Sequence, residues 1–180
     1  MDNFISKNLA VQAETLKPIK EIQRNIDESL IRIRRFIQYL RPPTLEYLGL
    51  LPALRELANQ VQEQSGIGID LRVNGSERHL APEQELLAYR IIQEAVRNVE
   101  KHSKAARAEI NIEFDEDNIT AIITDHGKGF EVNKSSKLLE KGKLGLMGMK
   151  ERAHLLGGTL EISSKPNGGT TVTLNIRKKA

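Results

Sequence analysis

The chain of 180 residues is long enough for one ordinary domain with a full hydrophobic core. It contains no Cys, which excludes a disulfide framework and a thiolate metal site. Its 27 basic and 24 acidic residues are mixed along the chain and give a net charge of +3, which on its own does not favour nucleic-acid binding. No apolar run approaches the ~20 residues of a membrane span, so we expect this chain to be cytoplasmic, with any membrane attachment supplied from outside it.

Apolar residues recur from Ile19 to Leu40 in steps of three and four, the spacing of a helix with one apolar seam. The positions between them are charged, so the narrow seam favours a partner helix, and packing onto the chain's own domain is the alternative. A separate helical piece is predicted over Asn3–Glu14, and Pro42-Pro43 is expected to end the long helix. We therefore predict that residues 1–43 are part of a helical dimerisation region.

From residue 44 onward, helical and strand patterns alternate. Helices are predicted over Leu48–Gln64, Pro82–Ser103 and Leu146–Leu156, and strands over Ile67–Val73, Ala106–Phe114, Ile119–Thr124, Thr159–Ser163 and Thr170–Ile176. The stretch from Gly127 to Lys143 has no periodicity and is predicted to be a long functional loop. Strands joined by hairpins, with helices between them, predict an α+β two-layer sandwich for residues 44–180, with the N-terminal helical arm as an appendage.

A polar stripe runs along the helix predicted over Pro82–Ser103. It consists of Glu94, Asn98, Lys101 and His102, beside the apolar face that should pack on the sheet. Asn98 offers an oxygen ligand for a hydrated Mg²⁺, Lys101 and His102 offer donors to phosphate, and Glu94 could order or deprotonate an attacking group. The alternative on this segment alone is an ordinary solvated helix face.

Two glycine-rich segments flank the long loop. The first, DHGKGF, begins with Asp125 at a strand end, where a carboxylate beside glycines suits a purine amino group. The second, GKLGLMGM, opens a helix at about Leu146 and offers free backbone N–H groups to phosphate. Neither matches the GxxxxGK[ST] or GxGxxG pattern, so the P-loop and Rossmann interpretations fail.

Taken in order, QEAVRNVEKHSKA, DHGKGF, GLMGMKERA and GGTTVTL resemble the N box, the two glycine boxes and the terminal Gly-Thr strand of the GHKL ATPase superfamily, which includes histidine kinases, gyrase B, Hsp90 and MutL. LRPPTLEYLGLLPAL, SGIGIDL and the form GLMGMKERA are similar to the histidine kinases that sense nitrate and lipid fluidity. The likeness extends from about Pro18 to the end of the chain. It implies the GHKL ATP-binding fold, with ATP and Mg²⁺ as cofactors.

The resemblance also implies roles for individual residues. Asp125 would bind the adenine amino group, Asn98 would ligate Mg²⁺, and Glu94 would be the acidic residue of the N box, with a catalytic role. The other implied ATP-binding residues shape the base pocket (Gly127, Gly129, Thr170), contact phosphates (Lys101, His102) or form the hinge of the ATP lid (Gly145, Leu146, Gly148, Met149).

Two departures from the family pattern limit this transfer. His126 stands where the family usually has Asn, which could weaken Mg²⁺ binding or make it pH-dependent. The family's phosphoacceptor histidine lies on the first dimerisation helix, but no His precedes His79 here, and His79 and His154 have the contexts of ordinary surface or packing residues. We therefore expect the acceptor to lie outside this sequence.

The resulting hypothesis is the ATP-binding core of a two-component sensor histidine kinase. It would transfer the γ-phosphoryl group to a histidine outside this sequence, for relay to the receiver domain of a response regulator, and act as a homodimer through its N-terminal helices. One alternative keeps the fold but makes the chain a non-kinase nucleotide-binding regulatory module. A second, a DNA-binding protein, is motivated by Arg32, Arg34, Arg35 and Arg41 but lacks a helix-turn-helix pattern, so no direct nucleic-acid contact is expected.

Overall fold

The computed structural model describes Ile22, Ile26 and residues 42–131 and 144–177. The chain divides into two compact units, Met1–Pro43 and Thr44–Ala180. In the first unit Ile22 and Ile26 are helical and exposed. The rest of the predicted arm, including Asn3–Glu14 and the four arginines of the DNA-binding alternative, lies outside the described residues, so the dimerisation helix stays a prediction.

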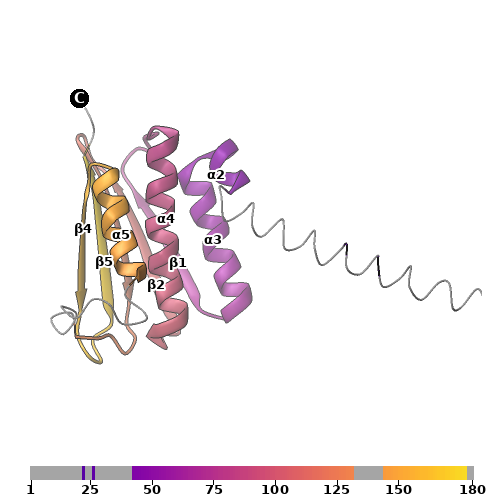
Figure 1. Cartoon of the computed structure of the whole chain (residues 1–180), viewed down its shortest axis with the longest axis vertical. Helices are drawn as coiled ribbons and strands as arrows, with labels where there is room; N and C mark the ends of the chain where they lie inside the picture. The colour runs from indigo at the N-terminus through magenta and orange to yellow at the C-terminus, as the bar shows by residue number, and fades with distance from the viewer. Residues whose placement is uncertain (1–21, 23–25, 27–41, 132–143, 178–180) are drawn as a thin grey trace, which may run out of the picture. The chain divides into compact units, whose positions relative to one another are not determined.

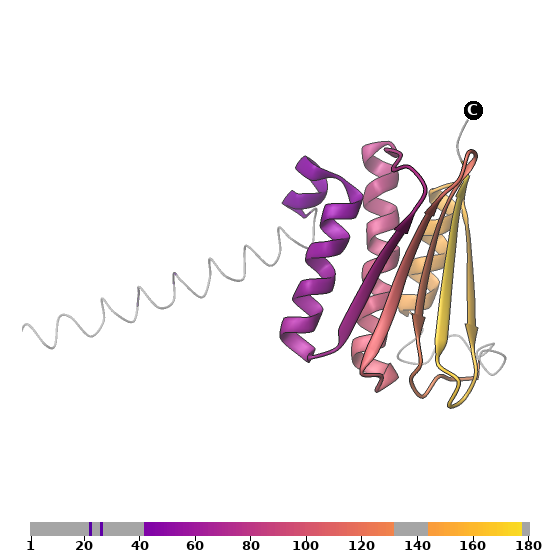
Figure 2. The same ribbon diagram turned by 180° about the vertical axis from the view of Figure 1, so that it is seen from behind.

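In the second unit the helices cover one face of a five-stranded sheet, which is the predicted α+β two-layer arrangement (Figures 1 and 2). The elements in chain order are α2 (Pro43–Leu48), α3 (Leu50–Ser65), β1 (Gly68–Asn74), α4 (Pro82–Asn98), η1 (Val99–Ser103), β2 (Arg107–Phe114), β3 (Asn118–Asp125), α5 (Leu144–Leu155), β4 (Thr159–Ser164) and β5 (Thr170–Arg177). In the described part of the chain no helix combines the length and the apolar character that crossing a membrane requires.

The strands lie in the order β1-β2-β3-β5-β4. β1 and β2 are parallel because α4 and η1 form the crossover between them, whereas the other neighbours are antiparallel. The register pairs Asp125, the last residue of β3, with Thr170, the first residue of β5, and Ser164 at the end of β4 with the same Thr170. The ends of β3 and β4 and the start of β5 therefore meet at one end of the sheet.

The core lies between the helices and the sheet. Strand residues alternate between buried and half-buried, as in β3, where Ile119, Ala121 and Ile123 face the helices. The helices bury one stripe each, which for α4 includes Ile91, Ile92, Ala95 and Val96 and for α5 Met149 and Ala153. This packing sets which side of α4 faces the sheet, and part of the polar stripe lies on that side.

Two predicted helices differ from the structure. Pro43 is the first residue of a further short helix, α2, because proline lacks only an N–H that the first helical turn leaves unbonded. Gly49, with φ of 86°, separates α2 from α3, so the helix predicted from Leu48 begins at Leu50. The long helix predicted to Ser103 ends as an α-helix at Asn98 and continues as the π-helical turn η1, a form often found at functional sites.

Candidate nucleotide-binding site

A cavity of about 350 Å³ lies between the C-terminal half of α4, η1, the first turn of α5 and the ends of β3, β4 and β5. Its walls are mainly apolar, and a few polar side chains converge on it, as in a typical small-molecule site. The lining residues are Ala95, Asn98, Val99, His102, Ser103, Ile123, Asp125, Lys128, Gly129, Phe130, Leu146, Ile162, Thr170 and Val172.

Asp125 is the buried charged residue of this cavity, and it is only 4% exposed. Its Oδ1 accepts a hydrogen bond of 2.8 Å from the backbone N–H of Gly127. A buried carboxylate can be tolerated only where donors face it, and Gly127 provides one of them. The remaining acceptor capacity of Asp125 is available to a ligand that brings its own N–H groups.

Gly127 and Gly129 hold the loop after β3 close to its neighbours. A Cβ at Gly127 would collide with the carbonyl oxygen of Ser103, which accepts a hydrogen bond of 2.7 Å from the N–H of Lys128. Gly129 has φ of 54°, and a Cβ there would collide with the carbonyl oxygen of Lys165. Both glycines are therefore required by the close approach of backbone segments, which brings the loop against the end of η1 and the β4–β5 turn.

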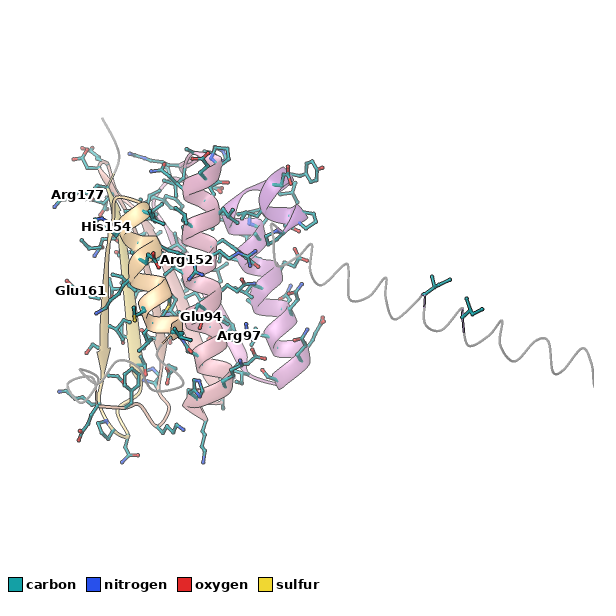
Figure 3. All side chains as sticks on the ribbon, in the orientation of Figure 1. Glu94, Arg97, Arg152, His154, Glu161 and Arg177 are labelled. Atoms are coloured by element: carbon teal, nitrogen blue, oxygen red, sulfur yellow. The ribbon has the colours of Figure 1, made fainter. Side chains whose placement is uncertain are left out.

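The polar stripe of α4 and η1 divides into two parts. Asn98 and His102 line the cavity, whereas Glu94 and Lys101 do not, and Lys101 is exposed. Glu94 projects from α4 beside the first turn of α5, where its Oε1 occupies the space that a Cβ at Gly145 would need (Figure 3). Glu94 belongs to the regular part of α4, whereas Lys101 lies in the π-helical turn η1 that follows it.

The predicted hinge residues also lie at different depths. Leu146 lines the cavity, Met149 is fully buried beneath α5, and Gly145 and Gly148 do not reach the cavity. The side chain of Arg152 folds back over Gly148, with Nη1 at 3.0 Å from the position of an added Cβ. The two glycines of this motif therefore make room for charged side chains, Glu94 beside Gly145 and Arg152 beside Gly148.

The predicted residues thus fall into two groups. The structure brings Asn98, His102, Asp125, Gly129, Leu146 and Thr170 together around the cavity. Gly127 lies directly behind this wall and bonds to Asp125, whereas Glu94, Lys101, Gly145, Gly148 and Met149 lie outside it. His126 is exposed and does not line the cavity either.

Sequence reasoning missed several lining residues. Lys128 and Phe130 lie inside DHGKGF and could have been found from that motif, because they flank Gly129. Ser103, Ile162 and Val172 carry no local signal, since only the tertiary arrangement of η1, β4 and β5 brings them to one cavity. The cavity therefore has a cation, Lys128, and an aromatic ring, Phe130, that the initial interpretation did not use.

A divalent cation would have to be shared with a ligand. Among residues 42–131 and 144–177 no group of three or more His, Asp or Glu side chains is placed to hold a metal. Asn98 provides a neutral oxygen at the cavity wall, which fits a Mg²⁺ ion that keeps water and takes its charged ligands from substrate phosphates.

The profile of the family described as histidine kinase-, DNA gyrase B- and HSP90-like ATPases matches residues 83–180. The chain belongs to this ATPase family. The match begins at the first turn of α4 and includes every element that contributes to the cavity. The resemblance inferred from the order of the motifs is therefore confirmed.

Curated relatives of this ATPase chain are sensor kinases. It is 37% identical to the signal transduction histidine-protein kinase/phosphatase DegS of Brevibacillus brevis over 91% of its own length and 41% of that protein. It is 34% identical to the oxygen sensor histidine kinase NreB of Staphylococcus carnosus over 91% of its length and 46% of that protein. The chain spans less than half the length of each of these relatives.

Solved structures of the same fold support the architecture of the ATPase unit. The histidine kinase AdeS of Acinetobacter baumannii matches with a TM-score of 0.59 at 16% identity, over 87% of this chain and 84% of that one. The histidine kinase domain of the blue-light activated kinase of Erythrobacter litoralis EL346 matches with a TM-score of 0.54 at 19% identity, over 68% and 62%. At these identities the likeness shows the fold alone, and it confirms the predicted fold class.

Proposed function

We propose that this chain is the ATP-binding catalytic part of a bacterial two-component sensor histidine kinase. The observation that carries the proposal is the buried carboxylate of Asp125 at the end of a mainly apolar cavity, opposite Thr170 in the β3–β5 register. Apolar walls suit the faces of a purine ring, and a buried acceptor suits its exocyclic amino group. The family match and the similarity to named sensor kinases support the same conclusion.

In this proposal the two ends of the cavity have different tasks. Asp125 accepts a hydrogen bond from the adenine amino group, Gly127 and Gly129 shape the base pocket, and Thr170 completes it. Asn98 and His102, on the helical wall, face the phosphates, and Lys101 reaches them from the exposed side of η1. Leu146 and the residues around it, Gly145, Gly148 and Met149, form the hinge on which the ATP lid moves.

The reaction is an in-line phosphoryl transfer. An imidazole nitrogen of the acceptor histidine forms a bond to the γ-phosphorus, and the bond from that phosphorus to the β–γ bridging oxygen breaks, so ADP leaves with the electron pair. Mg²⁺ held by Asn98 and the phosphates, when bound, neutralises the charge on the phosphate oxygens. Glu94 is proposed to order or deprotonate the attacking imidazole. Its carboxylate lies against Gly145, in the first turn of α5.

The acceptor histidine lies outside this sequence in our proposal, and the phosphoryl group passes from it to the receiver domain of a response regulator. The intact protein is proposed to be a homodimer through its N-terminal helices, and this part of it to act in the cytoplasm, with any membrane attachment supplied from outside this sequence. The similarity to DegS and NreB supports these assignments, since their names describe signal transduction and oxygen sensing by histidine kinases.

The proposal is tested by supplying the acceptor. The chain is incubated with γ-labelled ATP and Mg²⁺ and with the helical region of its own full-length protein, and acid-labile, base-stable label on histidine is measured. We expect label with the wild-type chain and none with Asp125→Asn. ATP binding without transfer would favour the regulatory module, and no ATP binding by the wild-type chain would contradict the assignment of the cavity.

A further inference from the structure

Ser164, the last residue of β4, lies where three segments around the cavity meet. Its half-buried hydroxyl oxygen accepts a hydrogen bond of 2.9 Å from the N–H of Phe130, lies 2.8 Å from the carbonyl oxygen of Gly169 and is 3.0 Å from the hydroxyl oxygen of Thr170. Phe130 and Thr170 line the cavity, whereas Ser164 itself does not. Ser164 therefore touches the site only through its neighbours.

Each hydroxyl of this cluster has one proton, and either Ser164 or Thr170 could donate across their 3.0 Å contact, so the direction follows from which acceptor has to be satisfied. A serine hydroxyl has one proton to donate, a carbonyl oxygen only accepts, and a backbone N–H only donates. Gly169 is buried, so its carbonyl oxygen needs a hydrogen-bond donor, and Ser164 can be that donor. The proton of Ser164 therefore goes to the carbonyl of Gly169. It follows that Thr170 donates its own proton to Ser164, and the lone pairs of Thr170 Oγ1 remain for the cavity.

A second acceptor lies beside the first. Asp125 is paired with Thr170 across β3 and β5, and both line the cavity. The carboxylate of Asp125 has acceptors only, and Oδ1 already accepts from Gly127. Two neighbouring acceptors are complementary to an amino group with two N–H bonds, either directly or through one water.

We propose that Ser164 is a positioning residue that sets the preference of this site for purines with an amino group at C6 over purines with a carbonyl at C6. By taking the proton of Thr170, Ser164 holds that hydroxyl as an acceptor next to Asp125, so a C6 carbonyl oxygen would face two acceptors and no donor. This arrangement discriminates strongly against the carbonyl purine, because its oxygen and the two acceptors would all be left without hydrogen-bond partners. The inference rests on the proposed function, since it assumes that the purine of ATP occupies this cavity.

The test compares ATP with inosine triphosphate, which carries a C6 carbonyl in place of the amino group. Dissociation constants for both are measured by calorimetry on the wild-type chain, on Ser164→Ala and on Ser163→Ala. Ser163 is the matched control because it precedes Ser164 in β4, is exposed and points to the opposite face of the sheet. In Ser164→Ala the Thr170 hydroxyl can turn and donate to a carbonyl oxygen, so we expect the ratio of ATP to inosine triphosphate affinity to fall by roughly ten-fold.

Equal losses for both nucleotides in Ser164→Ala would overturn the inference, because a merely structural role weakens both alike. An unchanged ratio, or the same fall in Ser163→Ala, would overturn it too. The inference and the proposed function fail differently: a wild-type chain that does not bind ATP, or an Asp125→Asn chain that binds ATP as tightly as the wild-type chain, contradicts the proposed function itself.

Thr170→Val provides a second test, which holds even if Ser164→Ala does not fold. Valine keeps the shape of threonine but removes the hydroxyl, so the same ratio should fall, and Ser164→Ala in the Thr170→Val background should change it no further. An unchanged ratio in Thr170→Val, or an additional fall in the double variant, would contradict the route through Thr170. Thr171→Val is the control, because Thr171 pairs with Thr124 and does not line the cavity.

Discussion

The floor of the cavity and its rim are built differently. At the floor, backbone hydrogen bonds join the loop after β3 to the β4–β5 turn, from Asn167 to Lys128 at 2.6 Å and from Gly169 to Gly127 at 3.0 Å. At the rim, the first turn of α5 is held by packing, with Met149 buried and Gly145 against the side chain of Glu94. Directional bonds fix a geometry, whereas packing of a helix end tolerates small shifts, so we expect the floor to change less than the rim when a nucleotide binds.

The largest effect should come from removing the charge at the floor. Asp125→Asn turns an acceptor pair into a mixed group whose amide N–H₂ can face the adenine amino group, and we expect ATP affinity to fall about 100-fold or more, about 3 kcal/mol. Calorimetric titration of ATP measures this loss. Asp117→Asn, in the β2–β3 turn, is the control and should bind as the wild-type chain does.

Backbone strain at the floor should lower the free energy of unfolding by nearly as much as Asp125→Asn lowers the free energy of ATP binding. Gly129→Ala adds the cost of φ 54° to a collision with the carbonyl oxygen of Lys165, so we expect the free energy of unfolding to fall by about 3 kcal/mol. Gly157→Ala carries a similar penalty at φ 74°, but nothing lies within 4 Å of the added Cβ, so about 1 kcal/mol is expected. Urea denaturation of both variants measures the difference, and equal losses would show that the close approach at Gly129 does not matter.

At the rim, one side chain of α5 should matter mainly for stability and another mainly for ATP binding. Met149→Ala removes a fully buried side chain beneath α5 and should lower the free energy of unfolding by about 2 kcal/mol. Leu146→Ala removes a half-buried side chain at the cavity wall and should cost less stability but several-fold in ATP affinity. Thermal unfolding and ATP titration of the two variants check this, and the reverse order in stability would contradict the described packing of α5.

A smaller effect is expected outside the cavity wall. Lys101 is exposed, so its contribution to phosphate binding is limited by solvent screening, and Lys101→Ala should weaken ATP binding only a few-fold, about 1 kcal/mol. Adenosine has no phosphates and should bind Lys101→Ala and the wild-type chain equally. Lys150→Ala, an exposed lysine on the outer side of α5, is the control. An equal loss for adenosine and ATP would mean that Lys101 supports the fold and does not contact phosphate.

The smallest effect concerns Tyr89, on the far side of α4 from the floor and the rim. Burial raises the pKa of the Tyr89 phenol above its ordinary value of about 10, opposed by the charge of Arg90 and aided by that of Glu56. The folded protein therefore resists ionisation of Tyr89, and the stability present below about pH 10 is lost as the pH rises through the raised pKa. Tyr89→Phe should differ from the wild-type chain by less than about 1 kcal/mol at pH 7 and should lack this part of the alkaline loss.

Urea denaturation at a series of pH values measures the contribution of Tyr89. Tyr47→Phe is the control, since Tyr47 is 80% exposed and should change neither the stability at pH 7 nor its alkaline decline. A decline at high pH that is the same in Tyr89→Phe and the wild-type chain would contradict the effect of burial.

Much of the fold follows from local patterns in the sequence. The alternation of Ile119–Thr124 and Thr170–Ile176 matches β3 and β5 to within a residue at each end, because one face of each strand is buried and the other is not. The short helix α2 was missed because Pro42-Pro43 was interpreted only as a helix end, although proline is also favoured at a helix start. The π-helical turn η1 leaves no mark in a periodicity that assumes a regular helix.

The candidate site was predictable where a motif carries the chemistry, as for Asp125 and Asn98. Which members of a motif reach the cavity was not predictable, since Glu94 and Lys101 belong to the same polar stripe as Asn98 and His102 but do not line the cavity. Ser164 follows directly after the predicted strand Thr159–Ser163, and it belongs to none of the motifs. Its role depends on the register of β4 against β5, which joins residues through long-range pairing and not through spacing in the sequence.

The most direct test of the central claim is a crystal structure of this chain with Mg²⁺ and a non-hydrolysable ATP analogue. The account predicts the adenine amino group within hydrogen-bond distance of the Asp125 carboxylate, with the base between the apolar walls and the phosphates toward Asn98 and His102. A nucleotide bound elsewhere, or bound in this cavity with its amino group away from Asp125, would contradict it.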